Sequence, residues 1–245
     1  MVIIFFILGL IFGSFINALI WRFFVNKSIF AKHSICPHCH QPLAFWDLVP
    51  ILSFLALRAR CRYCRQKISW QYPLVELVTA VVFVLVYRQW GLSYQTFFYS
   101  VISLFLIIIF IYDLKYYLIL DRVVWPAIIL SLIFNLIIGY SFWSLILGGI
   151  IVAGFFSLQF IISRGRWIGG GDIRLGFLIG VILGWPQVLI ALILAYVTGA
   201  IVGVMLILSK NKSWSSAIPF GTFLTSSTFF CLFYGQAILN WYLWF

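Results

Sequence analysis

Long apolar segments separated by shorter polar ones recur along the whole chain. A transmembrane helix needs about 20 mostly apolar residues, or somewhat fewer where the helix is short or buried by its neighbours. We expect such helices at about residues 2–22, 73–88, 97–112, 123–141, 143–162, 174–185, 186–208 and 218–243. The pattern therefore predicts an all-α polytopic membrane protein with about eight transmembrane helices.

The composition supports this class, because 64% of the residues are hydrophobic and 9% are charged. A soluble domain carries about a quarter charged residues, so an ordinary soluble fold is excluded. The first apolar segment begins at Val2 with no basic residue before it, and no convincing small-residue cleavage site follows it. We therefore expect a retained first helix rather than a removable signal peptide.

The basic residues predict the orientation of these helices, because cytoplasmic loops carry an excess of Lys and Arg. If the N-terminus lies outside, the loops before the second, fourth, sixth and eighth helices are cytoplasmic. All 16 basic residues except Arg88 lie in those loops or at their helix ends, namely Arg22, Lys27, Lys32, Arg58, Arg60, Arg62, Arg65, Lys67, Lys115, Arg122, Arg164, Arg166, Arg174, Lys210 and Lys212. We expect both termini outside the cytoplasm.

The same segregation accounts for the formal net charge of +11. Basic residues that face an anionic cytoplasmic leaflet gain about 1 kcal/mol each, so topology and attraction to lipid are sufficient causes. No basic surface interleaved with aromatic residues stands apart from the membrane edge. We expect membrane lipid, and no nucleic acid, among the partners.

Residues 23–72 form the one long polar loop, and this loop contains two C-x2-C pairs, Cys36 with Cys39 and Cys61 with Cys64. Two such pairs, separated by about 20 residues, are typical of a zinc ribbon in which four thiolates complete a tetrahedron. Two disulfides are the alternative, but a cytoplasmic loop keeps its thiols reduced. The loop is therefore predicted to bind zinc.

The predicted zinc ion has a structural role, because four protein ligands leave no open position for water. Metal binding would also stabilise a loop that has few apolar residues of its own. Four thiolates leave the site with a net negative charge, and Arg60, Arg62 and Arg65 are close enough in sequence to offset it. Cys231, alone in the last apolar segment, is expected to be a buried apolar residue.

Asp113 is the least expected of the five acidic residues. It ends the apolar run 105–113, at the C-terminal end of the third expected helix. A carboxylate at that end meets the negative end of the helix dipole, where it is disfavoured, so a cap does not explain it. Acids at the membrane edge are functional candidates by default, and Asp113 is therefore one.

Three other acids have adequate structural explanations. A turn or cap suffices for Asp47, and Glu76 follows Pro73 in the expected first turn of the second helix, where it would compensate the helix dipole. Asp121 lies just before the fourth expected helix, where an N-cap and a functional role explain it equally well.

Asp172 follows three glycines, Gly169 to Gly171, and precedes the sixth expected helix. An N-cap would explain it, but three glycines also permit positive φ angles and the close approach of another chain. The predicted topology places Asp172 and Asp113 at the same cytoplasmic depth.

Two carboxylates at one depth suit general acid–base chemistry, because one can keep a proton while the other activates water. Such a pair cleaves an amide without a covalent intermediate. No histidine accompanies a candidate serine in the apolar segments, and no H-E-x-x-H motif occurs. The residues alone favour an aspartyl peptidase, with a transporter that uses paired acids as the alternative.

A series of motifs carries a family resemblance over nearly the whole chain. In order these are GSFINALIWR from Gly13, the pair Cys36 and Cys39, DLVPILS from Asp47, RARCRYC from Arg58, ISWQYPLVEL from Ile68, Asp113 with Asp121, GGGDIRL from Gly169 and IPFGTFL from Ile218. The chain resembles the type IV prepilin peptidases, also called prepilin leader peptidase/N-methyltransferases.

This resemblance implies a GxGD-type intramembrane aspartyl protease of the bacterial cell membrane, with Asp113 and Asp172 as its catalytic pair. Its substrates would be type IV prepilin or pseudopilin precursors with a short basic leader, a Gly and then a hydrophobic helix. Cleavage after that Gly at the cytoplasmic face is expected. Methylation of the new N-terminus with S-adenosylmethionine is expected as well.

Four further residues are implied as accessory site residues: Asp121, Gly169, Gly171 and Arg174. The chain departs from the usual family pattern at two places nearby. Leu120 stands where Pro is common, and Ile173-Arg174 replaces Val-Lys. The positive charge at the second place is retained.

We expect three segments along the chain: a first transmembrane helix at 1–22, a cytoplasmic zinc-binding loop at 23–72, and a transmembrane protease core at 73–245. Two alternatives stay open. One is a peptidase without methyltransferase activity, and the other is a non-catalytic membrane transporter or assembly factor.

Overall fold

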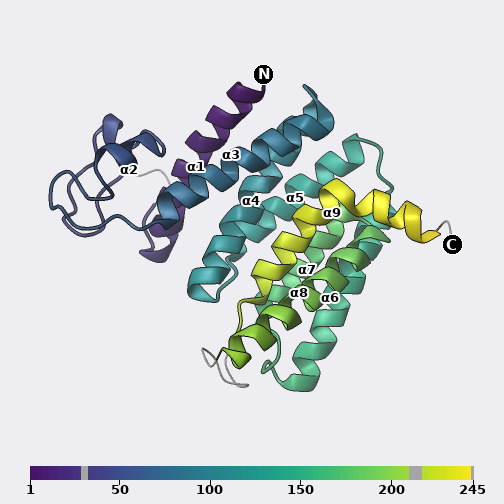
Figure 1. Cartoon of the computed structure of the whole chain (residues 1–245). Helices are drawn as coiled ribbons and strands as arrows, with labels where there is room; N and C mark the ends of the chain where they lie inside the picture. The colour runs from purple at the N-terminus through teal and green to yellow at the C-terminus, as the bar shows by residue number, and fades with distance from the viewer. Residues whose placement is uncertain (29–32, 210–216, 244–245) are drawn as a thin grey trace. The chain divides into compact units, whose positions relative to one another are not determined.

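The computed structural model describes residues 1–28, 33–209 and 217–243, and within these ranges the chain is helical, with no β-strand beyond two isolated bridges (Figure 1). Lys32, Lys210 and Lys212, which the sequence assigns to cytoplasmic loops, lie outside the described residues. The elements are α1 (Val2–Phe24), η1 (Phe45–Asp47), α2 (Leu52–Ala56), α3 (Gln71–Trp90), α4 (Tyr94–Tyr116), α5 (Asp121–Ile137), α6 (Phe142–Ser163), α7 (Gly170–Leu183), α8 (Gln187–Leu208) and α9 (Phe220–Leu243).

Six helices, α1, α3, α4, α6, α8 and α9, are long and apolar enough to cross a membrane. The predicted all-helical membrane architecture is therefore confirmed. The other two expected spans correspond to shorter helices, α5 with 17 residues and α7 with 14 residues. At about 1.5 Å per residue, α7 is shorter than the apolar thickness of a bilayer.

Several predicted helix boundaries were wrong, among them the end of the third helix, which runs to Tyr116 rather than to about residue 112. The fourth helix ends at Ile137 rather than near residue 141, because Gly139 takes a φ of 90° and reverses the chain. The sixth helix begins at Gly170 rather than at residue 174, so Asp172 lies inside the helix. Glycine is a poor helix former, and here the packing of α7 against its neighbours overrides that preference.

The chain divides into two compact units, Met1–Leu104 and Phe105–Phe245, and α4 contributes its first half to one and its second half to the other. In unit 1, α1 and α3 pack side by side (Figure 1). Gly13 lies so close to α3 that a Cβ atom there would be 2.6 Å from the Cα of Glu76, and Gly9 meets Ala80 in the same way. Close backbone contact through small residues is how helices associate in lipid.

The long loop of unit 1 contains two turns of the same form, one at each cysteine pair. In the first, Cys36 N–H donates to the Gln41 carbonyl at 3.0 Å; in the second, Cys61 N–H donates to the Gln66 carbonyl at 2.9 Å. The residue after each pair, His40 or Arg65, has a positive φ near 60°. The two turns therefore have the same geometry, and each presents two thiols.

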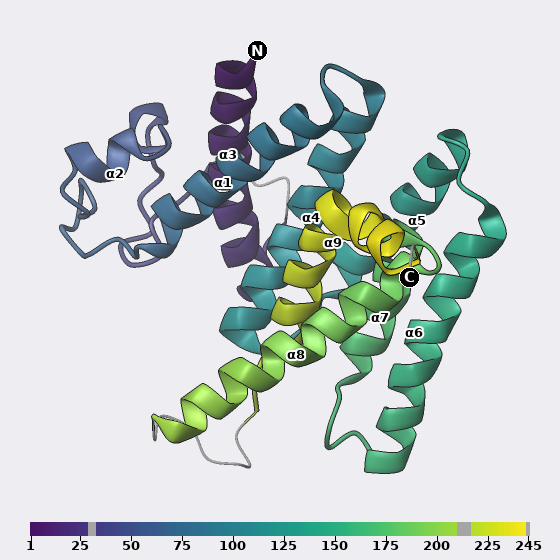
Figure 2. The ribbon, with the colours of Figure 1, turned by 45° about the vertical axis from the view of Figure 1, so that its right-hand side comes forward.

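In unit 2, α7 packs against α5, α6 and α9, and Figure 2 shows it alongside α6. Its residues from Leu175 to Leu183 are almost all buried, as expected for a helix that is apolar on every side. Gly180 contacts the backbone of Gly148 and Gly149 on α6 directly. The Asn135 side chain of α5 donates to the Val181 carbonyl at 2.8 Å, which ties the C-terminal end of α7 to α5.

Candidate active site and metal site

Asp113 lies in the last turn of α4 and is 5% exposed. Its Oδ2 atom accepts a hydrogen bond of 3.0 Å from the backbone N–H of Thr222, the third residue of α9. The first N–H groups of a helix lack partners within that helix and carry partial positive charge. Asp113 therefore caps a different helix. The expectation that a cap does not explain it considered only the dipole of its own helix and was wrong.

Asp172 is the third residue of α7 and is 8% exposed. Its Oδ2 atom accepts a hydrogen bond of 3.1 Å from the backbone N–H of Gly169, the residue that actually holds the N-cap position. The predicted N-cap role of Asp172 was thus displaced by three residues. Its other oxygen, Oδ1, is buried and has no hydrogen-bond partner among the described residues.

Positive φ angles and close approach of another segment were both expected at the glycine run, and the structure shows only the close approach. None of Gly169, Gly170 and Gly171 has a positive φ, because Gly169 is extended at −80° and the next two begin a helix. Close approach does occur at Gly171, where an added Cβ would lie 2.9 Å from the Cβ of Ile119. An added Cβ at Gly170 would meet nothing within 4 Å.

Ile119, in the segment between α4 and α5, contacts Gly171, which precedes Asp172 on α7, and Gly221, which lies against Asp113. Beside its contact with Gly171, its Cδ1 atom would lie 3.2 Å from a Cβ added at Gly221. That same added Cβ would lie 2.9 Å from Oδ2 of Asp113. The two carboxylates are near enough for their charges to interact. Two buried acids, one with an unpaired oxygen, are the arrangement that general acid–base chemistry on a water molecule requires.

Asp121 and Arg174 form an ion pair at the start of α5 and in the first turns of α7. Asp121 is the first residue of α5 and Leu120 holds the N-cap position, so the predicted N-cap role of Asp121 was wrong by one residue. Of the four accessory residues, Gly169, Gly171 and Arg174 are thus within three positions of Asp172 in sequence, and Asp121 binds Arg174.

The four loop cysteines lie together, with all their Sγ atoms within 4.8 Å of one another. A tetrahedral site with Zn–S bonds of about 2.3 Å requires sulfur atoms about 3.8 Å apart, so the cluster needs only small adjustments. All five cysteines of the chain are free thiols, which argues against the disulfide alternative. The cluster fits a metal ion with four thiolate ligands.

The thiols of the cluster differ in their pKa values, because the pKa of Cys61 is lowered whereas those of Cys36 and Cys64 are raised. Burial acts to raise the pKa of the Cys61 thiol, but the backbone N–H groups of Cys64 and Tyr63 and the thiols of Cys36 and Cys64 outweigh burial and lower that pKa to about 7. A thiolate is the form of cysteine that binds metal. The hydrogen bonds that stabilise this thiolate come from the turn that presents it and from Cys36 in the other turn.

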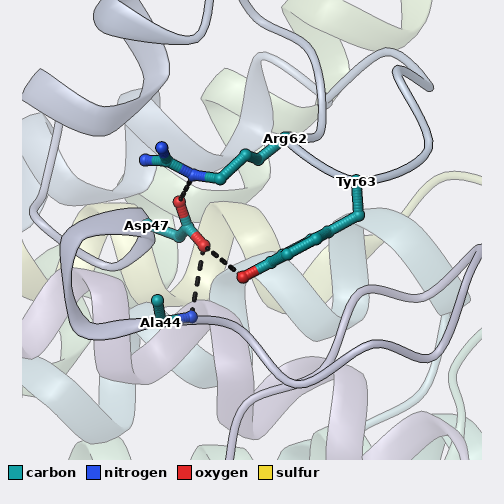
Figure 3. Close-up of polar contacts among 4 residues, drawn as sticks. All are labelled: Ala44, Asp47, Arg62 and Tyr63. Atoms are coloured by element: carbon teal, nitrogen blue, oxygen red, sulfur yellow. Dashed lines mark hydrogen bonds and ion pairs between the residues drawn. The ribbon is translucent and has the colours of Figure 1, made fainter.

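Arg62, next to the second cysteine pair, binds Asp47 (Figure 3). Its Nε atom lies 2.7 Å from Oδ1 of Asp47, and this contact raises the pKa of the guanidinium. The other oxygen of Asp47 accepts from Ala44 N–H at 3.1 Å and from the Tyr63 hydroxyl at 3.3 Å. Asp47 therefore joins the middle of the loop to the second cysteine pair, beyond the simple turn role predicted for it.

Glu76 corrects a second prediction. It is the sixth residue of α3, beyond the first turn, so it does not compensate the helix dipole there. Its Oε2 atom instead accepts a hydrogen bond of 2.8 Å from the N–H of Ile51, which has the unusual φ of 59°. The carboxylate is 6% exposed. Glu76 thus anchors the end of the loop segment 48–51 to α3.

Comparison with known proteins identifies the family. A model described as the bacterial peptidase A24 N-terminal domain matches residues 7–90, and one described as the type IV leader peptidase family matches residues 100–204. The chain is 34% identical to the prepilin leader peptidase/N-methyltransferase of Bacillus subtilis (strain 168), over 99% of this chain and 98% of that protein. The proteins of the same name from Aeromonas hydrophila and Legionella pneumophila are each 32% identical, over 97% and 89% of this chain and 92% and 78% of their own lengths.

The chain belongs to the type IV leader peptidase family. No solved structure matches it. The resemblance inferred from the ordered motifs is confirmed, and the match to residues 100–204 contains Asp113, Asp121 and Asp172.

In this leader peptidase family member, sequence reasoning missed Tyr196 and Thr222, which lie beside the aspartates, and Gln159, which contacts Tyr196. Tyr196 of α8 lies within electrostatic reach of Asp172, and its hydroxyl is 2.9 Å from the side-chain amide nitrogen of Gln159 on α6. Thr222 lies in the quoted motif from Ile218, but nothing in that motif names its partner. The available signal for Tyr196 and Gln159 was polarity inside otherwise apolar helices.

Proposed function

We propose that this chain is a membrane-embedded aspartyl endopeptidase that removes the basic leader of type IV prepilin or pseudopilin precursors and N-methylates the new N-terminus. The observation that supports the proposal most is the burial of Asp113 and Asp172, with Oδ1 of Asp172 left without a hydrogen-bond partner among the described residues. Two buried carboxylates at the ends of α4 and α7 approach one another within a chain that has only five acids. Full-length similarity to proteins named prepilin leader peptidase/N-methyltransferase supports the substrate class.

In the proposed reaction, an ionised aspartate accepts a proton from water as the water oxygen attacks the scissile carbonyl carbon. The protonated aspartate then donates its proton to the leaving amine as the C–N bond breaks. Two carboxylates near one another favour this division of protonation states, because like charges resist simultaneous ionisation. The unpaired Oδ1 of Asp172 is the oxygen best suited to bind the water.

Under this proposal the precursor's hydrophobic helix lies in the bilayer beside unit 2, and its leader reaches the cytoplasm. The protein is a multi-pass protein of the bacterial inner membrane, with the cysteine loop and Asp113 and Asp172 facing the cytoplasm. The segregation of Lys and Arg between alternate loops supports this orientation. Residues 73–245 then form the protease core, and residues 1–22 and 23–72 form the first transmembrane helix and the metal loop.

Cys36, Cys39, Cys61 and Cys64 would hold a structural zinc ion, which folds the loop and leaves no position open for catalysis. S-adenosylmethionine, when bound, would supply the methyl group for the new N-terminus. Among the described residues none carries a signature for that cofactor, so the methylation is proposed from the names of the relatives alone.

The test is co-expression with a pilin-like precursor that carries a basic leader, a Gly and a hydrophobic helix. Gel mobility should show a loss of leader-sized mass that depends on the chain. Asp113→Asn is the matched control, because it keeps the shape of the side chain but removes its acid–base function. Mass spectrometry of the mature N-terminus then separates the two activities, because methylation adds one methyl group. An uncleaved precursor in the presence of the folded, membrane-inserted chain would contradict the peptidase assignment.

A further inference from the structure

Asp121, which forms an ion pair with Arg174, is more exposed to solvent than the other four acids of the chain. The Asp121 side chain is 49% exposed and the Arg174 side chain 37% exposed. All five acids lie within the described ranges, and the side chain of Asp47 is 3% exposed while Glu76, Asp113 and Asp172 are all below a tenth. Asp121 is therefore the one acidic side chain whose carboxylate a cation outside the fold can reach once Arg174 gives up its contact.

This accessible carboxylate is close in sequence to residues that lie around the two buried ones. Asp121 follows Ile119 by two residues, and Ile119 is the side chain that contacts both Gly171 and Gly221. Arg174 follows Asp172 by two residues on α7. A leader of several residues, extended at about 3.3 Å per residue, can therefore bring a basic side chain from the scissile bond to the ion pair.

We infer that Asp121 is a specificity-determining residue that binds a Lys or Arg of the substrate leader, and that Arg174 occupies this carboxylate until the leader replaces it. The inference rests on the proposed function, because it assigns a partner to the basic charge of the leader. An exposed ion pair contributes little to stability, so exchange of one cation for another at Asp121 costs little. A leader without positive charge cannot replace Arg174 at Asp121, so it gains no contact there.

The inference makes Asp121 and Arg174 act in opposite directions, whereas a purely structural ion pair would make them act alike. The measurement is kcat/KM of the purified full-length chain in detergent for two precursors. One precursor has its natural basic leader, and the other has every leader Lys and Arg replaced by Gln. The ratio of the two values, basic over neutral, is the readout.

Asp121→Asn should lower this ratio about two- to fivefold, the range that one exposed ion pair supplies. Arg174→Gln should raise the ratio, because the leader no longer competes with an internal cation. Asp121→Glu is the conservative variant, and it should keep a ratio above that of Asp121→Asn. Thermal unfolding of each variant shows whether the fold is retained.

A ratio that falls in both Asp121→Asn and Arg174→Gln, or that changes in neither, overturns the inference and leaves the proposed function intact. A charge reversal adds a second test. Asp121→Lys should favour a precursor with Glu in place of the leader Lys and Arg, and a preference for the basic leader in that variant would also overturn the inference. If the unaltered chain cleaves neither precursor, the proposed function fails and this inference fails with it.

Discussion

Asp113 and Thr222 are joined by a hydrogen bond of 3.0 Å from the Thr222 backbone N–H to the Asp113 carboxylate, although 109 residues separate them in sequence. The bond places an acid from the last turn of α4 at the N-terminal end of α9. Partial positive charge at that helix end stabilises a carboxylate that its own helix end disfavours. A structural role and a proposed catalytic role thus coincide in one side chain.

Substitutions at Asp113 should separate these two roles. Asp113→Asn keeps an oxygen that accepts from Thr222, so the chain should still accumulate in membranes while cleavage of a precursor falls about 10²- to 10⁴-fold. Asp113→Ala removes the cap as well and should lower the stability by about 1 kcal/mol relative to Asp113→Asn. Precursor cleavage and thermal unfolding in detergent measure the two effects. Equal stability of the two variants would show that the cap contributes nothing.

The corresponding change at Asp172, Asp172→Asn, should likewise affect cleavage while the capping hydrogen bond is kept. In Asp172→Asn the remaining side-chain oxygen still accepts from the N–H of Gly169, so α7 should keep its first turn. Cleavage should fall by about 10²- to 10⁴-fold, because the pair no longer supplies both an acid and a base. Retained cleavage by membrane-inserted Asp172→Asn would remove this residue from the proposed mechanism.

The glycines near the aspartates provide a graded test of geometry. An added Cβ at Gly171 would lie 2.9 Å from Ile119 Cβ, whereas one at Gly170 would meet no atom within 4 Å. Gly171→Ala should displace Ile119 and lower cleavage about 10- to 100-fold, because small misplacements of catalytic groups are costly. Gly170→Ala is the matched control and should strengthen α7, since Ala is the better helix former. Rates of precursor cleavage compare the pair, and similar losses in both would indicate a general effect of glycine replacement.

Glu76 should matter for the loop of unit 1 through its contact with Ile51. Glu76→Gln keeps an acceptor for the Ile51 N–H, whereas Glu76→Ala leaves that donor without its partner. The loss of such a bond costs about 1–3 kcal/mol, and Ile51 holds a positive φ that few non-glycine residues adopt unaided. Limited proteolysis should cut the segment 48–51 faster in Glu76→Ala than in Glu76→Gln. Equal rates of cutting would argue that the loop keeps its path without this bond.

Metal binding at the cysteine cluster should be visible in the metal content of the purified chain. Cys36→Ser removes one of the four clustered thiols and should release the ion and expose the loop to protease. Cys231→Ser is the matched control, because Cys231 is buried in α9 and has no part in the cluster. One metal ion per chain in the control and far less in Cys36→Ser is the expected result. Equal metal content in both variants would locate the ion elsewhere.

The errors of prediction share a physical origin. Glu76 was assigned to its own helix dipole and Asp121 and Asp172 to N-cap positions, because local rules consider only neighbours in sequence. The structure gives Glu76 a partner in the loop, Ile51, and moves both aspartates inside their helices. Tyr196 and Gln159 were missed for the same reason, since they come from different helices and meet only after α6 and α8 have packed.

The sequence by itself determined the helical membrane class, the metal-binding pattern of the loop, the family and the identity of the two candidate aspartates. These follow from apolar run length, from the spacing of cysteines and from ordered motifs, all of which are properties of short segments. Only the tertiary structure decided that Asp113 caps α9, that Ile119 brings Gly171 and Gly221 together, and that Asp121 is the exposed acid. Those relations depend on contacts between helices distant in sequence, and burial and partners of a charge exist only once those helices pack.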